Sequence, residues 1–124
     1  MANILVVDDS SLSRRTSRRI LESAGHAVTE AADGMSALER YAVDRPDLVL
    51  LDVTMAEMGG LEVLAQLRAM DPAARVVMAT ADVQTSTRTL STAVGAVGFV
   101  AKPLTTDSVV RAVDAALAGQ GAVQ

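Results

Sequence analysis

Cysteine and tryptophan are absent from this chain of 124 residues, and histidine occurs once, at His26. Without cysteine the protein has no disulfides, no thiolate metal sites and no thiol nucleophile. A single histidine also excludes a metal site built from several imidazoles. Any chemistry therefore has to rest on carboxylates, hydroxyls and amines.

Aromatic residues and positive charge are scarce as well. Aromatic residues make up 2% of the chain, and 11 Lys and Arg stand against 15 Asp and Glu, for a formal net charge of −4. Nucleic-acid binding needs a basic surface that neutralises phosphates, and single strands also need aromatic side chains on which bases stack. We therefore expect no nucleic-acid partner.

Long hydrophobic runs are also missing. No stretch reaches the roughly 18 apolar residues of a membrane-spanning helix. The N-terminus shows neither a charged leader nor a cleavage site. These absences favour a cytoplasmic protein without membrane insertion.

What remains is the composition of an ordinary globular domain. Hydrophobic residues make up 50% of the chain and charged residues 21%, a balance that excludes a disordered segment. Since domains typically have about 100–200 residues, we expect residues 1–124 to form a single domain.

Short apolar runs of strand length alternate with longer segments that have apolar residues at helical spacing. Strands are predicted at Ile4–Val7, Ala27–Thr29, Leu48–Leu51, Val76–Ala79 and Gly98–Ala101. Helices are predicted at Ser11–Ala24, Met35–Val43, Leu61–Met70, Ser86–Val94 and Asp107–Ala118. Five strand-helix units in strict alternation predict an α/β fold, a parallel sheet with helices on both faces.

Polar residues follow four of these strands at the point where each strand ends. They are Asp8 and Asp9 after the first strand, Asp52 after the third, Thr80 after the fourth and Lys102 after the fifth. In open parallel sheets ligands bind at the carboxyl ends of the strands. We therefore expect three carboxylates, a hydroxyl and an ammonium to converge at one edge of the sheet.

Taken singly, most of these residues have plainer explanations. Asp8 and Asp9 could cap a helix, Thr80 could serve a turn, and Lys102 could be a solvated lysine. Asp52 is harder to dismiss, because it interrupts an apolar run that resumes at Val53, and a buried carboxylate needs partners to stay charged.

A cluster of three carboxylates needs more positive charge than Lys102 supplies. A hard divalent cation such as Mg²⁺, or Mn²⁺ in its place, prefers oxygen ligands and suits such a site. With that cation present, Asp52 can attack a phosphoryl group as a nucleophile. Thr80 and Lys102 would then contact the phosphoryl oxygens.

These residues resemble the receiver domains of two-component response regulators. The resemblance covers essentially the whole chain, and several motifs occur in order at the family's spacing. They are Val6-Val7-Asp8-Asp9-Ser10, Leu51-Asp52, Met55, Met58, Gly60-Leu61, Ala79-Thr80-Ala81, Gly95, Phe99 and Lys102-Pro103. The resemblance implies a flavodoxin-like (βα)5 fold with strand order 2-1-3-4-5 and five helices, in a stand-alone receiver of the chemotaxis-regulator type.

The resemblance also implies roles for single residues. Asp52 matches the phosphoacceptor, Asp9 the direct Mg²⁺ ligand and Asp8 an acidic neighbour that acts largely through water. The backbone carbonyl of Thr54 matches a further metal ligand.

A second group of matched positions concerns the switch. Thr80 and Phe99 match a pair in which the hydroxyl turns toward the phosphoryl group and the ring moves inward. Lys102 matches the lysine of the site, and the resemblance implies that its peptide bond to Pro103 is cis.

The partners follow from the same resemblance. A histidine kinase or phosphotransfer domain would dock on the first helix, where Arg14 and Arg18 are candidate contacts; a solvated basic face is the plainer interpretation. A downstream target protein would contact Arg88, Phe99 and Arg111. We expect a monomer.

One departure from the family pattern follows Asp52. Ala56 stands where many receivers have proline, so the loop is expected to be more mobile. Gly59-Gly60 is expected to loosen it further.

The function predicted is a switch activated by Mg²⁺-dependent transfer of a phosphoryl group from a phosphohistidine to Asp52, most simply in chemotaxis. Such a protein catalyses its own phosphorylation and dephosphorylation without being a conventional enzyme. The alternatives are an adaptor or phosphate sink in another two-component pathway, and a phosphorylation-independent interaction domain. A Mg²⁺-dependent phosphatase and a flavin-binding protein fit less well, because Asp8 and Asp9 are adjacent and aromatic residues are scarce.

Overall fold

The computed structural model describes residues 2–53, 55, 58–81 and 95–118. Its strands form one parallel sheet in the order β2-β1-β3-β4-β5, as predicted. The strands are β1 (Asn3–Val7), β2 (Ala27–Ala31), β3 (Leu48–Asp52), β4 (Val76–Thr80) and β5 (Gly98–Ala101). β2 and β5 are therefore the edge strands.

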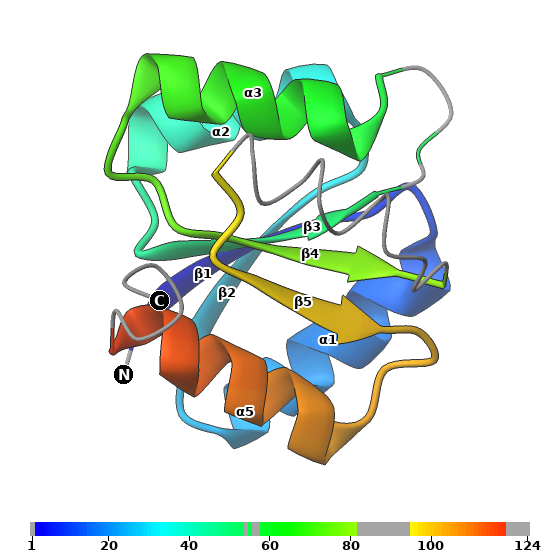
Figure 1. Ribbon diagram of the computed structural model, residues 1–124. Coiled ribbons are helices and arrows are strands. Elements are labelled where there is room, and N and C mark those ends of the chain that lie inside the picture. The colour runs from blue at the N-terminus through cyan, green and yellow to red at the C-terminus, as the bar shows by residue number, and fades with distance from the viewer. Residues whose placement is uncertain (1, 54, 56–57, 82–94, 119–124) are drawn as a thin grey trace.

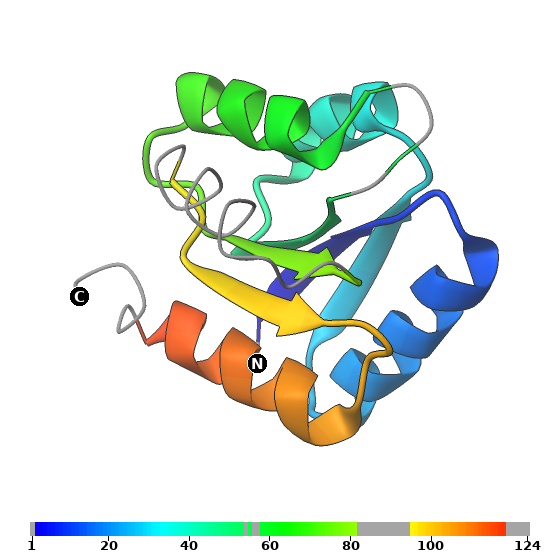
Figure 2. The same ribbon diagram turned by 45° about the vertical axis from the view of Figure 1, so that its right-hand side comes forward.

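Helices cover both faces of the sheet. α1 and α5 lie against one face, and α2 and α3 lie against the other (Figures 1 and 2). Their bounds are α1 (Ser11–Ser23), α2 (Gly34–Asp44), α3 (Gly60–Met70) and α5 (Thr106–Leu117). The described part of the chain thus contains four of the five predicted helices, and the predicted helix Ser86–Val94 lies outside the described residues.

The near-continuous apolar runs of the inner strands reflect burial on both faces of the sheet. Along β1, Leu5 and Val7 belong to the core under α2 and α3, whereas Ile4 and Val6 belong to the core under α1 and α5. All four are at most 1% exposed. Burying one such side chain stabilises the fold by about 1.5–3 kcal/mol. The strands therefore form a rigid frame, and the polar residues lie at their carboxyl ends.

Capping side chains define where helices begin beside this edge. The Ser10 hydroxyl accepts a hydrogen bond from the Ser13 N–H at the start of α1. At the start of α5, Thr105 and Ser108 form a reciprocal capping box. α1 and α5 therefore begin soon after β1 and β5 end. Asp8, Asp9 and Lys102 lie in the short loops that connect each strand to its helix.

Candidate functional site

The fold places the predicted polar residues at one edge of the sheet. β3 ends at Asp52 and β4 ends at Thr80, while Asp8 and Lys102 directly follow β1 and β5. The arrowheads of β4 and β5 point to the same side of the molecule in Figure 1. The parallel arrangement of the strands is what brings together residues up to 94 positions apart, as in the Asp8 and Lys102 pair.

Three carboxylates form the centre of this site. One oxygen from each of Asp8, Asp9 and Asp52 can be chosen so that all three lie within 4.8 Å of one another. Asp8 and Asp52 are only 4% and 5% exposed, whereas Asp9 is exposed. The site is therefore open to solvent on the side of Asp9 and closed by protein around the other two carboxylates.

Lys102, the only lysine of the chain, bridges the two buried carboxylates. Its Nζ lies 3.0 Å from Asp8 Oδ2 and 3.2 Å from Asp52 Oδ1. Burial disfavours the ammonium, but the hydrogen bond to Asp8 and the charges of Asp52 and Asp8 outweigh burial and raise the pKa of Lys102 above its usual value. Lys102 is thus positively charged at neutral pH.

The donor set suits a hard divalent cation. Three carboxylates against one ammonium leave an excess of negative charge at the site. Mg²⁺ binds oxygen ligands, keeps several of its waters and typically uses one or two carboxylates. The Asp8, Asp9 and Asp52 carboxylates can hold such an ion; Thr54, expected to add its backbone carbonyl, lies outside the described residues.

Asp8 is held from several sides. Its Oδ1 accepts a hydrogen bond from the Ser10 N–H at 2.9 Å, and its Oδ2 accepts one from Lys102. Its own N–H continues the pairing of β1 with β2 by donating to the Ala31 carbonyl at 3.1 Å. Both carboxylate oxygens of Asp8 therefore have fixed directions.

The predicted switch residues Thr80 and Phe99 lie on β4 and β5, which are neighbours in the sheet. Thr80 is 3% exposed, and its carbonyl accepts a hydrogen bond from the Lys102 N–H at 2.9 Å. Phe99 is half-buried against the core under α2 and α3. The Lys102–Pro103 peptide bond is cis.

Gly60, where α3 begins, packs closely behind Asp52. Its N–H donates to the Val53 carbonyl at 2.9 Å, and a Cβ at this position would meet the Asp52 carbonyl oxygen and approach the Val53 Cα to 2.7 Å. Gly59, in contrast, has open space around its Cα. The chain therefore requires a glycine at residue 60 to pass so closely behind Asp52. Ala56 lies outside the described residues.

Two arginines of α1 share a partner on β2 that the sequence did not reveal. Arg14 and Arg18 both form ion pairs with Glu30 on β2, at 3.1 Å and 2.6 Å, and Arg18 also pairs with Glu22. The sequence separations of 16 and 12 residues follow no helical or strand period. Only the packing of α1 on β2 could show the two contacts with Glu30.

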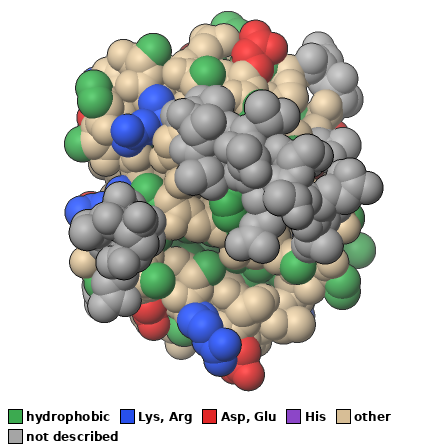
Figure 3. Space-filling view, viewed as in Figure 1, with side chains coloured by type: hydrophobic (Ala, Val, Ile, Leu, Met, Phe, Trp, Pro, Cys, Tyr) green, Lys and Arg blue, Asp and Glu red, His purple; other side chains and the backbone are tan. Residues whose placement is uncertain are grey.

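The other predicted partner-surface residues are less informative. Arg111 is exposed on α5, and Arg88 lies outside the described residues. On the face seen in Figure 3, described basic and acidic side chains are scattered among hydrophobic and other residues. Among the described residues visible on that face, charge marks no docking surface. Within the described ranges, none of the helices combines the length and apolar character that a membrane crossing requires.

Comparison with known proteins agrees with this geometry. The family model of the response regulator receiver domain matches residues 4–114, and the chain belongs to this family, whose members act in two-component systems as phosphorylation-activated response regulators.

Individual relatives cover nearly the whole chain. Chemotaxis protein CheY of Listeria monocytogenes is 38% identical over 117 residues, which are 94% of this chain and 98% of that protein. The structure of chemotaxis protein CheY4 of Vibrio cholerae has a TM-score of 0.88 at 31% identity and covers 92% of this chain and 97% of its own. A LuxR-family response regulator from Aurantimonas has a TM-score of 0.92 at 35% identity, with 97% and 87% covered.

Proposed function

We propose that this protein is a switch in which Asp52 accepts a phosphoryl group from a phosphohistidine of a histidine kinase or phosphotransfer domain. The observation that carries the proposal is the buried Asp52 carboxylate, which lies 3.2 Å from the Lys102 ammonium and beside two further carboxylates. A bound Mg²⁺ supplies positive charge that lets a carboxylate and a phosphoryl group approach each other. The chain's own residues position the reacting groups.

In the proposed reaction, an Asp52 carboxylate oxygen attacks phosphorus and forms a P–O bond. The P–N bond of the phosphohistidine breaks, and the imidazole leaves with the electron pair and takes up a proton. Lys102 carries the positive charge that stabilises the phosphoryl oxygens, because it already lies within hydrogen-bond distance of Asp52. Thr80, at the end of β4, is the hydroxyl that turns toward the product.

The phosphoryl group on Asp52 supplies the interaction energy for the conformational change of the switch. A phosphoryl group adds about 1.5–2 negative charges, so Thr80 and Lys102 interact more strongly with the phosphorylated site than with Asp52 alone. The Thr80 carbonyl is hydrogen-bonded to the Lys102 N–H, and Phe99 lies on the same strand as Ala101, the neighbour of Lys102. A movement at Thr80 can thus reach Phe99 through β5. We propose that Phe99, together with Arg111 and Arg88, belongs to the surface that a target protein contacts.

Chemotaxis is the pathway we propose first, because CheY proteins are similar to this chain over nearly their whole length. A role as adaptor or phosphate sink in another two-component pathway is the alternative, favoured by the similarity to a LuxR-family regulator.

Intact-mass measurement tests the phosphorylation itself. We expect the protein to gain the mass of one phosphoryl group from acetyl phosphate only when Mg²⁺ is present, in an adduct that is labile to base. Asp52→Asn should gain nothing, because an amide is not a nucleophile toward phosphorus. An equal gain in the variant would contradict the assignment of Asp52, and no gain in either protein would favour a phosphorylation-independent interaction domain.

Kinase docking on α1 requires a separate test, because Arg14 also has an internal role as an ion-pair partner. Arg18 is 43% exposed and can meet an acidic partner from solvent. We expect Arg18→Gln to slow transfer from the kinase while phosphorylation by acetyl phosphate keeps its wild-type rate. An equal loss with both donors would exclude a docking role, since acetyl phosphate needs no docking surface.

A further inference from the structure

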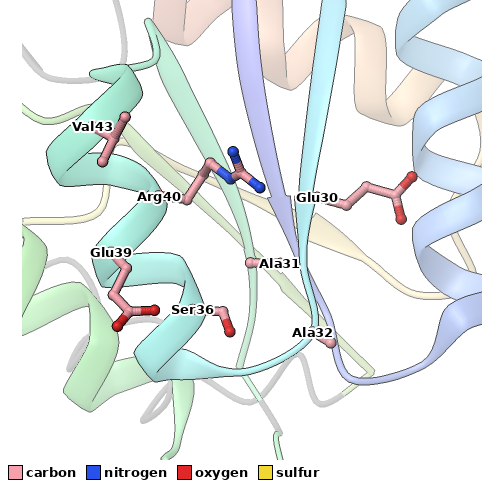
Figure 4. Close-up of a pocket in the computed structure, with 7 residues that line it drawn as sticks. All are labelled: Glu30, Ala31, Ala32, Ser36, Glu39, Arg40 and Val43. Carbon is pink, nitrogen blue, oxygen red and sulfur yellow. The ribbon is translucent and has the colours of Figure 1, made fainter.

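Glu30 ties the edge strand β2 to α1 through two arginines. Its Oε1 accepts a hydrogen bond from Arg14 Nε at 3.1 Å, and its Oε2 accepts one from Arg18 Nη1 at 2.6 Å. Figure 4 shows the Glu30 carboxylate pointing toward α1, away from α2 and from the surface groove of about 370 Å³ that lies between β2 and α2. The hydrogen bond from Arg18, opposed by burial and supported by that from Arg14, lowers the pKa of Glu30, which keeps it charged.

Arg14 uses a second nitrogen to reach the candidate metal centre. Its Nη1 donates to the backbone carbonyl of Asp8 at 2.6 Å. That carbonyl belongs to the peptide between Asp8 and Asp9, the two residues that directly follow β1. The Arg14 side chain is only 18% exposed, so the contact is sheltered from water.

The guanidinium geometry couples these two contacts. Its nitrogens lie in one rigid plane, so the bond from Nε to Glu30 sets the direction in which Nη1 points. Arg18 shares Glu30 but donates to Glu22 and Glu30 only, among the hydrogen bonds of the described residues. Glu30 therefore acts on the Asp8 carbonyl through Arg14 and not through Arg18.

We propose that Arg14, oriented by Glu30, is a positioning residue for the metal centre. By holding the peptide that joins Asp8 to Asp9, it fixes the directions in which the two neighbouring carboxylates leave the backbone. The inference rests on the proposed function, because it takes Mg²⁺ as the ion that these carboxylates bind. Its role is distinct from kinase docking, which concerns the solvent side of α1.

The sign of the effect separates positioning from simple electrostatics. Arg14 is a positive charge near a cation site, so on charge alone its removal would strengthen Mg²⁺ binding. Loss of a residue that orients a metal ligand weakens binding instead, on the order of tenfold at the lower end of such effects. Arg14→Gln therefore gives opposite results under the two explanations.

The test measures Mg²⁺ affinity by calorimetry on the full chain, without any phosphoryl donor. We expect the Kd to rise on the order of tenfold for Arg14→Gln and in the same direction for Glu30→Gln. Arg14→Lys keeps the charge but lacks the planar pair of donors, so it should also bind Mg²⁺ more weakly than the wild type. Arg18→Gln is the matched control, with an unchanged Kd.

Several outcomes would overturn the positioning role. An Arg14→Gln protein that binds Mg²⁺ as tightly as the wild type, or more tightly, excludes it. An equal loss of Mg²⁺ affinity in Arg18→Gln also excludes it, because the loss would then come from the ion pairs with Glu30 and not from the contact of Arg14 with the Asp8 carbonyl. Titrations are run below the thermal unfolding transition of each variant, and if Arg14→Gln does not fold, Arg14→Lys carries the same expectation, because it keeps the positive charge and loses only the planar pair of donors.

The same measurement keeps this inference apart from the proposed function. A wild-type protein that binds Mg²⁺ yet accepts no phosphoryl group refutes phosphotransfer to Asp52, while the comparison of Arg14 variants still stands. A wild-type protein that does not bind Mg²⁺ refutes the metal centre and, with it, the role of Arg14.

Discussion

Lys102→Gln is expected to slow phosphorylation of Asp52 by acetyl phosphate about 100-fold, the size of effect seen when one preorganised charge is removed from a reacting centre. The variant keeps Asp8, Asp9 and Asp52, so it should still bind Mg²⁺. The rate is measured by intact mass over time at saturating Mg²⁺. A rate within a fewfold of wild type would show that Lys102 does not contact the transferring group.

The same substitution should also change stability. Removing Lys102 leaves two buried carboxylates, Asp8 and Asp52, without their shared ammonium. We expect a loss of about 1–2 kcal/mol at neutral pH, which is less than for a fully buried pair because water screens the partly exposed ammonium. Mg²⁺ should restore much of this loss, since it supplies the missing charge. Urea unfolding with and without Mg²⁺ checks both statements.

The difference in stability between the wild type and Lys102→Gln should depend on pH, because the pKa of Lys102 is raised in the folded state. Because the pKa is raised in the folded state, the stabilisation by Lys102 is fully present below the usual lysine value of 10.5 and is lost as pH rises through the folded-state value. The wild type and Lys102→Gln should therefore differ at pH 7 to 9 and converge at higher pH.

One further measurement and one control variant make the Lys102 test specific. Since the chain has one lysine, labelling with ¹⁵Nζ-lysine gives a single side-chain signal, whose titration midpoint should lie above 10.5. Arg111→Gln is the control, because it removes a positive charge from an exposed position on α5. An equal loss of stability in that variant would point to net charge and not to the pairing with Asp8 and Asp52.

Gly60→Ala is expected to destabilise the protein by about 2–3 kcal/mol and to disturb the position of Asp52. The added Cβ would meet the Asp52 carbonyl oxygen and lie 2.7 Å from the Val53 Cα, both of which are backbone atoms that side-chain rotation cannot move. Alanine otherwise favours a helix over glycine by about 1 kcal/mol, so a loss has to come from this close contact. Thermal unfolding and the phosphorylation rate are the measurements.

Gly59→Ser provides the matched control for the Gly60 prediction. Gly59 is the N-cap of α3, with φ −65 and open space around its Cα. Serine is a preferred N-cap residue, so we expect a change of less than about 0.5 kcal/mol and a wild-type phosphorylation rate. If both substitutions destabilise equally, the loop tolerates no side chain at either position and the contact behind Asp52 is not the cause.

The sequence pattern alone determined the fold class, a parallel sheet with helices on both faces, because the strands and the described helices each have a local pattern of apolar residues. The apolar runs Ile4–Val7 and Leu48–Leu51 are too short for helices and too continuous for a half-exposed strand, which indicated strands buried on both faces. The strict alternation with helical segments then left a parallel sheet as the simple arrangement. Asp52 stood out for the same local reason, as a carboxylate within an apolar run.

The order of the strands and the roles of single residues came from the family resemblance and not from the pattern itself. Periodicity says which residues form β1 and β3 but not that they are neighbours in the sheet. The convergence of Asp8, Asp52 and Lys102 could be expected from their places at strand ends. The distances from the Lys102 ammonium, 3.0 Å to Asp8 and 3.2 Å to Asp52, depend on the register of β1, β3 and β5.

Only the tertiary structure decided the contacts that join separate elements. Gly60 looked like a source of mobility, whereas packing shows that it is required where α3 begins directly behind the Asp52 backbone. The sequence offered Arg14 only as a candidate contact for a partner, whereas the structure shows that it also donates hydrogen bonds to Glu30 and to the Asp8 carbonyl. Local sequence sets which segments are strands and helices, but which side chains meet depends on how those segments pack, because their partners lie on other elements.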